Sequence, residues 1–149
     1  MEIERKFLVK SDIWEKFEKP VPKSIKQAYL SNNEKRTIRV RTKGEKGFLT
    51  IKGETIGITR KEFEYEIPYS DAIDLIENFS EKVISKQRYE VPFGDHIWEV
   101  DVFEGKLVGL IIAEIELKDE NESFLKPEWV DIEVSHDPQY YNSNLIMKC

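Results

Sequence analysis

The sequence predicts an α+β chain, mainly antiparallel β, folded as a closed eight-stranded β-barrel with a charged lumen and helices packed outside. Segments of alternating apolar and polar residues recur along the chain and are separated by glycines, prolines and short turns. One face of nearly every segment carries arginine, lysine or carboxylate side chains, and the opposite face is apolar. Amphipathic helical segments are available to cover the apolar faces. About eight strands enclose an interior that holds one small ligand.

The length of 149 residues is that of one domain, predicted to span residues 1–149. Charged residues make up 35% of the chain, but eight Phe, six Tyr and three Trp indicate a folded protein rather than a disordered one. The net charge of −6 does not favour nucleic-acid binding, which requires a basic surface.

The sequence shows no sign of export or of a membrane-spanning helix. Met1 leads directly into a charged strand, and the longest apolar run is too short to cross a membrane as a helix. Cys149 is the only cysteine, so we expect no internal disulfide and a reducing, cytoplasmic location. His96 and His136 lie far apart in sequence, which argues against a His/Cys zinc site.

The N-terminal elements follow from alternation and from capping residues. Residues 2–9 form a strand with charged side chains on one face and a mainly apolar opposite face. Residues 11–18 form a short helix with Ser11 or Asp12 as its N-cap. Pro20 ends this helix, because proline cannot continue one.

The remaining elements are mostly strands. Four of them follow over residues 24–31, 36–43, 46–53 and 59–67. The segment Gly44-Glu45-Lys46-Gly47 is typical of a hairpin turn between the middle two. Ser70 is the predicted N-cap of a helix over 71–79. Three further strands are predicted over 82–92, 96–104 and 109–118, and the chain ends with a short strand at 131–135 and a helix at 139–147.

The charged faces of these strands are predicted to line the lumen. The cations are Lys6, Arg39, Arg41, Lys52, Lys86 and Arg88. The anions are Glu2, Glu4, Glu62, Glu64, Asp101, Glu114 and Glu116. Burying so many charges is costly unless each is paired or ligated, so a bound ligand explains them better than stability does.

Two other structures also produce such alternation. Any single strand of this kind fits an antiparallel sheet with one solvated face. A membrane barrel alternates apolar-out and polar-in, but Arg5 and Lys61 would then face lipid and the strands are interrupted by helical segments.

The composition of the predicted lumen indicates its ligands. Crowded carboxylates do not all ionise unless a cation lies among them. Ligand sets made only of oxygen select hard cations such as Mg²⁺, Mn²⁺ or Ca²⁺. Arginine offers paired donors to phosphate oxygens and lysine a point charge, so the cations suit a polyphosphate.

The first strand contains Glu2-Ile-Glu-Arg-Lys6, which matches an ExExK signature. Further motifs follow in a set order: Arg39-Val-Arg41, Thr50-Ile-Lys52, Glu62 with Glu64, Lys86-Gln-Arg88, Glu99-Val-Asp101 with Phe103 and Gly105, and Ala113-Glu-Ile-Glu116-Leu. In this ordered set the chain resembles, along almost its whole length, the CYTH family, the triphosphate tunnel metalloenzymes. The resemblance implies an eight-stranded antiparallel tunnel. It also implies hydrolysis of inorganic tripolyphosphate, thiamine triphosphate or RNA 5′-triphosphate ends, or cyclisation of ATP, and the short bacterial members commonly hydrolyse tripolyphosphate.

The site roles are predicted accordingly. One or two Mg²⁺ or Mn²⁺ ions are held by Glu2, Glu4, Asp101, Glu114 and Glu116. Glu62 and Glu64 complete a second metal site or orient the basic residues. The phosphates are bound by Lys6, Arg39, Arg41, Lys52 and Arg88. Tyr29 and Lys86 form the predicted proton-handling pair, because a nearby ammonium lowers the pKa of a phenol, and the alternative for Tyr29 is a hydrogen-bonding role in the wall.

Two other functions stay open. A class IV-type adenylate cyclase shares the tunnel and the metal, but only Met1 precedes ExExK and few elements remain to form a nucleoside pocket. A non-catalytic polyphosphate-binding module has little use for the carboxylate set. The expected partner is a small-molecule triphosphate rather than nucleic acid or a membrane, and homodimer formation is left open.

Overall fold

The computed structural model describes residues 2–33 and 35–149. Its strands are β1 (Glu2–Val9), β2 (Lys23–Asn33), β3 (Arg36–Lys43), β4 (Lys46–Ile56), β5 (Thr59–Ile67), β6 (Ile84–Phe93), β7 (His96–Phe103), β8 (Ile111–Glu116) and β9 (Val130–Glu133). The predicted strands are therefore all present, and most boundaries lie within a few residues of those expected from alternation.

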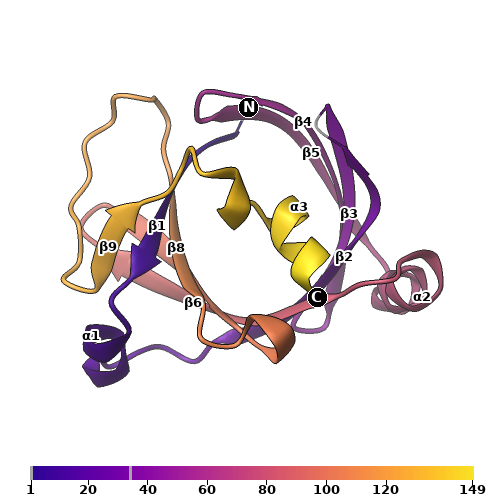
Figure 1. Ribbon diagram of the computed structural model, residues 1–149, viewed down its shortest axis with the longest axis horizontal. Coiled ribbons are helices and arrows are strands. Elements are labelled where there is room, and N and C mark those ends of the chain that lie inside the picture. The colour runs from indigo at the N-terminus through magenta and orange to yellow at the C-terminus, as the bar shows by residue number, and fades with distance from the viewer. Residues whose placement is uncertain (1, 34) are drawn as a thin grey trace.

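The first eight strands form a closed antiparallel barrel, seen end-on in Figure 1. They are hydrogen-bonded in the order β5-β4-β3-β2-β6-β7-β8-β1, and β1 closes the ring by pairing with β5 through Glu2–Arg60 and Ile3–Thr59. Further along, the same edge of β1 pairs with β9, at Phe7. The predicted eight-stranded barrel is confirmed, with one additional strand inserted at its seam.

Two helices lie outside the ring of strands (Figure 1). They are α1 (Ser11–Lys16) and α2 (Tyr69–Phe79). Both predicted side-chain caps are wrong, because α1 begins after Lys10 and α2 begins after Pro68, and neither of these residues makes a capping hydrogen bond through its side chain. Pro68 holds φ at −55°, which is already suited to helix initiation, so Ser70 lies inside the helix.

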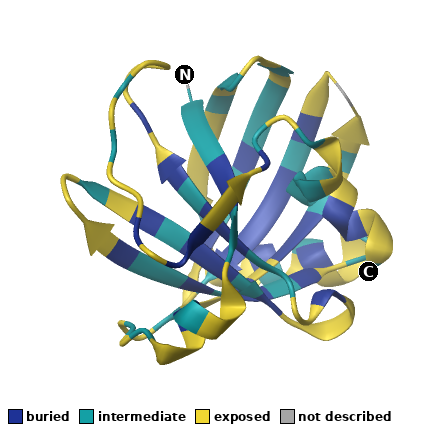
Figure 2. Ribbon diagram, turned by 60° about the vertical axis from the view of Figure 1, so that its left-hand side comes forward, coloured by how far each residue is buried: buried dark blue, intermediate teal, exposed yellow. Residues whose placement is uncertain are grey.

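Many residues of the strands are buried (Figure 2), and the outer core forms where the strands contact the covering segments. Trp14 of α1 packs edge-on against Trp129, which in turn packs against Trp98 of β7. On another side of the barrel, Ala72 and Ile76 of α2 pack with residues of β2 and β3. Together these contacts bury Trp14, Trp98, Trp129, Ala72 and Ile76.

The outer face of β5 is less covered than we expect from helical segments that pack on the apolar faces. Phe63 and Tyr65 are 48% and 55% exposed there. Their cross-strand partners on β4 are Ile51 and Leu49, which are partly buried. The strand next to the seam is therefore less covered than the rest of the barrel.

The C-terminal segment lies across the lumen rather than outside the barrel. It is broken into η2 (Pro138–Tyr140), α3 (Asn142–Leu145) and η3 (Ile146–Lys148), where one continuous helix was predicted. Leu145 and Ile146 pack with Phe103 and Ile112, whose cross-strand partners Lys86 and Asp101 belong to the charged inner face. Figure 1 shows α3 inside the outline of the ring. This segment, together with the 3-10 turn η1 (Gly105–Leu107), fills one part of the interior with apolar side chains.

Within the described residues, no helix has both the length and the apolar character needed to cross a membrane.

Candidate active site in the barrel lumen

The strand register places all of the predicted site residues on one face of the barrel wall. Cross-strand partners share a face, and the partners include Glu4 with Glu116, Lys6 with Glu114, Arg88 with Asp101, Tyr29 with Arg39, and Lys52 with Glu62. Five of the cations and Asp101 are buried, and most of the other members are partly buried, even though every member is polar or charged. The charged lumen predicted from alternation is therefore present.

The most enclosed ion pairs join Asp101 to two cations of β6. The guanidinium of Arg88 donates to both oxygens of Asp101, at 2.7 Å and 2.9 Å, and the Nζ atom of Lys86 lies 2.7 Å from Oδ2. Burial opposes ionisation of Asp101, but the two cations overcome it and hold its pKa well below the usual range. Burial also lowers the pKa of Lys86 to about 8, against the opposing effect of Asp101. Both Asp101 oxygens are engaged, which does not favour the predicted role of Asp101 as a metal ligand.

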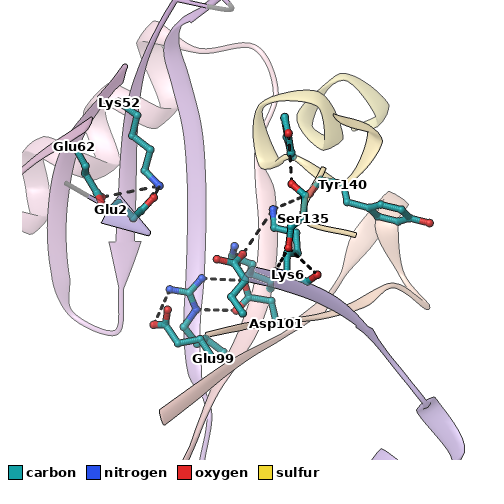
Figure 3. A network of polar contacts seen from close by, with 12 residues as sticks. Glu2, Lys6, Lys52, Glu62, Glu99, Asp101, Ser135 and Tyr140 are labelled. Carbon is teal, nitrogen blue, oxygen red and sulfur yellow. Dashed lines mark hydrogen bonds and ion pairs between the residues drawn. The ribbon is translucent and has the colours of Figure 1, made fainter. Parts of the chain in front are cut away.

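A second ion pair links β4 to the start of β1. The Nζ atom of Lys52 lies 3.1 Å from Glu2 and 4.0 Å from Glu62, so one ammonium lies between two carboxylates (Figure 3). Burial and the hydrogen bond with Glu62 raise the pKa of Glu2 to about 7, although Lys52 acts in the opposite direction. This end of the lumen therefore holds more negative charge than its lysine neutralises.

The same excess of negative charge continues into β1 and β8. Burial, Glu114 and Glu2 together raise the pKa of Glu4 well above its usual value. Burial also disfavours ionisation of Glu114, but Lys6, at 3.8 Å, and the hydrogen bond with Glu4 lower its pKa to about 2. Burial and nearby carboxylates raise the pKa of Glu116. A cation placed among these groups would relieve their mutual repulsion.

The donor set therefore fits a hard divalent cation, since it consists of carboxylate oxygens alone. The residues best placed to share one cation are Glu2, Glu4, Glu114 and Glu116. Lys52 links Glu62 to this group. Among residues 2–33 and 35–149, no three acidic, histidine or cysteine side chains are arranged closely enough to hold a metal ion as they stand.

Three arginines crowd the opposite part of the lumen. Arg39, Arg41 and Arg88 are all buried. Burial first, and then the neighbouring Arg39 and Arg88, lower the pKa of Arg41. The Nε atoms of Arg39 and Arg41 are buried without a hydrogen-bond partner among the described residues. An anion bound between these side chains would satisfy their free donors and their charge.

A cavity of about 60 Å³ lies between the acidic and basic groups. Its wall contains Glu2, Glu4, Lys6, Tyr29, Thr37, Arg39, Lys52 and Arg60 from the strands, and Ser135, Tyr141, Asn142 and Ser143 from the C-terminal segment. The Nζ atom of Lys6 donates to the backbone oxygen of Tyr140, at 3.0 Å (Figure 3). The C-terminal segment therefore contributes to the site itself.

The expected effect of Lys86 on Tyr29 is wrong. Burial raises the pKa of Tyr29, and the cations that oppose this rise include Arg39, Lys6 and Arg60. The ammonium of Lys86 is instead paired with Asp101. Tyr29 lines the cavity, but its phenol is held in the neutral form.

Sequence reasoning did not select Arg60 or the polar residues of the C-terminal segment. Arg60 shares strand parity with Glu62 and Glu64, so alternation already placed it on the inner face. Strand alternation does not predict where Ser135 and Tyr141 lie, because their positions depend on how the chain returns over the barrel.

The chain is similar to proteins of known name. Residues 1–144 match the family described as the CYTH domain. A protein of Acetivibrio thermocellus named inorganic triphosphatase is 47% identical over 146 residues, which cover 97% of this chain and 92% of that protein. A protein of Nitrosomonas europaea with the same name is 33% identical over 150 residues, covering 98% and 97%.

Solved structures agree with this result. The structure of the inorganic triphosphatase NE1496 has a TM-score of 0.68 at 30% identity, and the match covers 99% of this chain and 95% of that one. A structure described as an adenylate cyclase candidate from Bacillus halodurans has a TM-score of 0.63 at 17% identity, covering 80% and 82%, and so shows the shared fold alone. With its fold, its charged lumen and these similarities, the chain belongs to the CYTH domain family.

Proposed function

We propose that this protein hydrolyses inorganic tripolyphosphate, or a closely related triphosphate, with Mg²⁺ or Mn²⁺ as cofactor, and releases orthophosphate. The observation that carries the proposal is the separation of charge within one enclosed lumen. Buried arginines with free donors occur on one side, and crowded glutamates with raised pKa values occur on the other. A metal–polyphosphate complex matches both sides at once. Relatives that are 47% and 33% identical carry the name inorganic triphosphatase.

The basic residues would bind the phosphates. Arg39 and Arg41 present paired donors from β3, and Lys6 and Lys52 add point charges from β1 and β4. Arg88 is held in place by Asp101, which fixes the direction of its guanidinium. These cations also stabilise the negative charge that develops on the departing pyrophosphate when the bond to the terminal phosphorus breaks.

The glutamates would hold the cation. Glu2, Glu4, Glu114 and Glu116 form the proposed ligand set, and Glu62 and Glu64 complete a second site or orient the lysine and arginine beside them. A divalent ion supplies Lewis-acid polarisation of the phosphate and of the attacking water. Asp101 is left out of this set because it orients Arg88 and Lys86. Tyr29 is proposed to donate a hydrogen bond from its neutral phenol to the substrate.

Product analysis tests the proposal. Purified protein is offered tripolyphosphate, ATP, thiamine triphosphate or pyrophosphate, each with Mg²⁺, Mn²⁺, Ca²⁺ or chelator. We expect orthophosphate from tripolyphosphate, and none in chelator. Cyclic AMP and pyrophosphate from ATP would instead identify a cyclase, and metal-dependent binding of tripolyphosphate without turnover would identify a binding module. The cytoplasmic location and a possible homodimer stay predictions.

A further inference from the structure

Arg60 lies where the inner cavity meets a wider basin at the barrel mouth. The basin has a volume of about 600 Å³, against about 60 Å³ for the inner cavity. The residues that line both are Thr37, Thr55, Gly57, Arg60, Tyr141 and Ser143. Arg60 is the cation of this shared wall, so an anion that enters from the basin meets it first.

The guanidinium of Arg60 is oriented by neutral acceptors. Its Nε atom donates to the backbone oxygen of Gly53, at 2.9 Å, and its Nη2 atom donates to Oγ1 of Thr37, at 3.3 Å. Its cross-strand neighbour is Glu2, but the Glu2 carboxylate is paired with Lys52. Within the described residues, no carboxylate forms an ion pair with Arg60. Arg60 thus has unused N–H donors that are held in a fixed direction.

The other cations continue inward from this position. Arg39, Lys6 and Lys52 line the inner cavity with Arg60, whereas Arg88 belongs to the buried group around Asp101 and does not line that cavity. Arg60, Arg39 and Lys6 also act together on the pKa of Tyr29, which indicates that they share one electrostatic environment. The positive charges therefore form a series from the mouth to the buried Asp101 group.

We propose that Arg60 binds the outermost phosphate of a three-phosphate chain and so makes the site prefer tripolyphosphate to pyrophosphate. The proposal rests on the proposed function and extends it to substrate length. The inner cations bind two phosphates whether or not a third is present. Only the third reaches the mouth, where Arg60 forms no ion pair with any carboxylate of the described residues.

The test compares Arg60→Gln with Lys61→Gln. Lys61 is the next residue on β5 and is exposed on the opposite face, so this control removes the same charge without touching the lumen. Initial rates with Mg²⁺ give KM and kcat for tripolyphosphate, and pyrophosphate as a competitive inhibitor gives a Ki. For Arg60→Gln we expect KM to rise by roughly tenfold or more, as for loss of a charge-assisted hydrogen bond, while Ki changes less than about twofold. Lys61→Gln should leave both constants within about twofold.

Several results would overturn the proposal. These are an unchanged KM in Arg60→Gln, an equal loss of affinity for pyrophosphate, or an equal loss in Lys61→Gln. A fall in kcat at constant KM would also do so, because it would assign Arg60 to holding the β4 backbone at Gly53. Arg60→Lys keeps the charge but not the paired donors, so it should raise KM by a smaller factor, and it serves if Arg60→Gln does not fold.

Failure of the proposed function gives a different result. If the wild-type protein binds tripolyphosphate without hydrolysing it, titration calorimetry with the same variants and the same two anions still tests Arg60. If the wild-type protein binds neither anion, the proposed function and the role of Arg60 both fall. If it hydrolyses tripolyphosphate and Arg60→Gln behaves as wild type, only the role of Arg60 falls.

Discussion

Asp101 and Arg88 form a paired, two-hydrogen-bond contact across β7 and β6, with donor–acceptor distances of 2.7 Å and 2.9 Å. Asp101 is 2% exposed, and Lys86, which is fully buried, approaches the same carboxylate. One acid thus forms ion pairs with two cations inside the barrel wall. This arrangement assigns Asp101 to orienting Arg88 and Lys86, whereas the excess carboxylates lie elsewhere in the lumen.

The first prediction concerns the stability that Asp101 provides. Asp101→Asn removes the carboxylate that the buried Arg88 and Lys86 share, so we expect the free energy of unfolding in urea to fall by about 3–5 kcal/mol. Glu99→Gln is the matched control, because Glu99 also contacts Arg88, at 3.2 Å, but its side chain is 39% exposed. The control should lose no more than about 1 kcal/mol. Equal losses in the two variants would contradict a special role for Asp101.

The second prediction concerns acid pH. The pKa of Asp101 is depressed in the folded protein, so the folded state binds fewer protons at this group than the unfolded state does. The resulting stability is complete above the unfolded pKa of about 4 and is lost progressively as the pH falls below it. Thermal melts between neutral and strongly acidic pH should therefore show a steeper loss of Tm in wild type than in Asp101→Asn. Parallel curves would show that the pKa of Asp101 is not strongly depressed in the folded protein.

The third prediction separates stability from activity at Glu4. Burial, Glu114 and Glu2 all disfavour ionisation of Glu4. In the presence of chelator, Glu4→Gln should therefore melt at the same temperature as wild type or at a higher one. The variant should nevertheless lose on the order of 100-fold in turnover if Glu4 holds the cation. Glu77→Gln, which removes an exposed carboxylate of α2, is the control and should keep full activity. Normal hydrolysis by Glu4→Gln with an unchanged metal requirement would refute the ligand assignment.

The fourth prediction concerns Tyr29. Because burial raises its pKa, the phenol stays protonated at neutral pH and cannot act there as the main general base. Tyr29→Phe should therefore keep turnover within about threefold of wild type, since loss of a general base costs about 100-fold or more. The measurement is kcat as a function of pH. A collapse of kcat in Tyr29→Phe, with loss of an alkaline limb, would restore Tyr29 as the proton-handling residue.

Much of the fold and the composition of the lumen were predictable from the sequence. Side chains alternate along a strand, so the parity of Arg39 with Arg41, or of Glu114 with Glu116, places each pair on one face whatever the neighbouring strands are. Because helical segments were available to cover the apolar faces, the repeated charged faces were predicted to point inward. The family was also predictable, because the motifs occur along the chain in the order that is typical of that family.

Tertiary structure alone decided which charges meet. Asp101 pairs with Lys86, so Lys86 is not available to Tyr29, and this contact depends on the register between β6 and β7. The closure of β1 on β5 places Arg60 beside Glu2, residues that lie far apart in sequence. Alternation is a local property of one strand, whereas ion pairing, cavity walls and the return of the C-terminal segment over the lumen depend on distances between strands. Those distances are set only when the barrel closes.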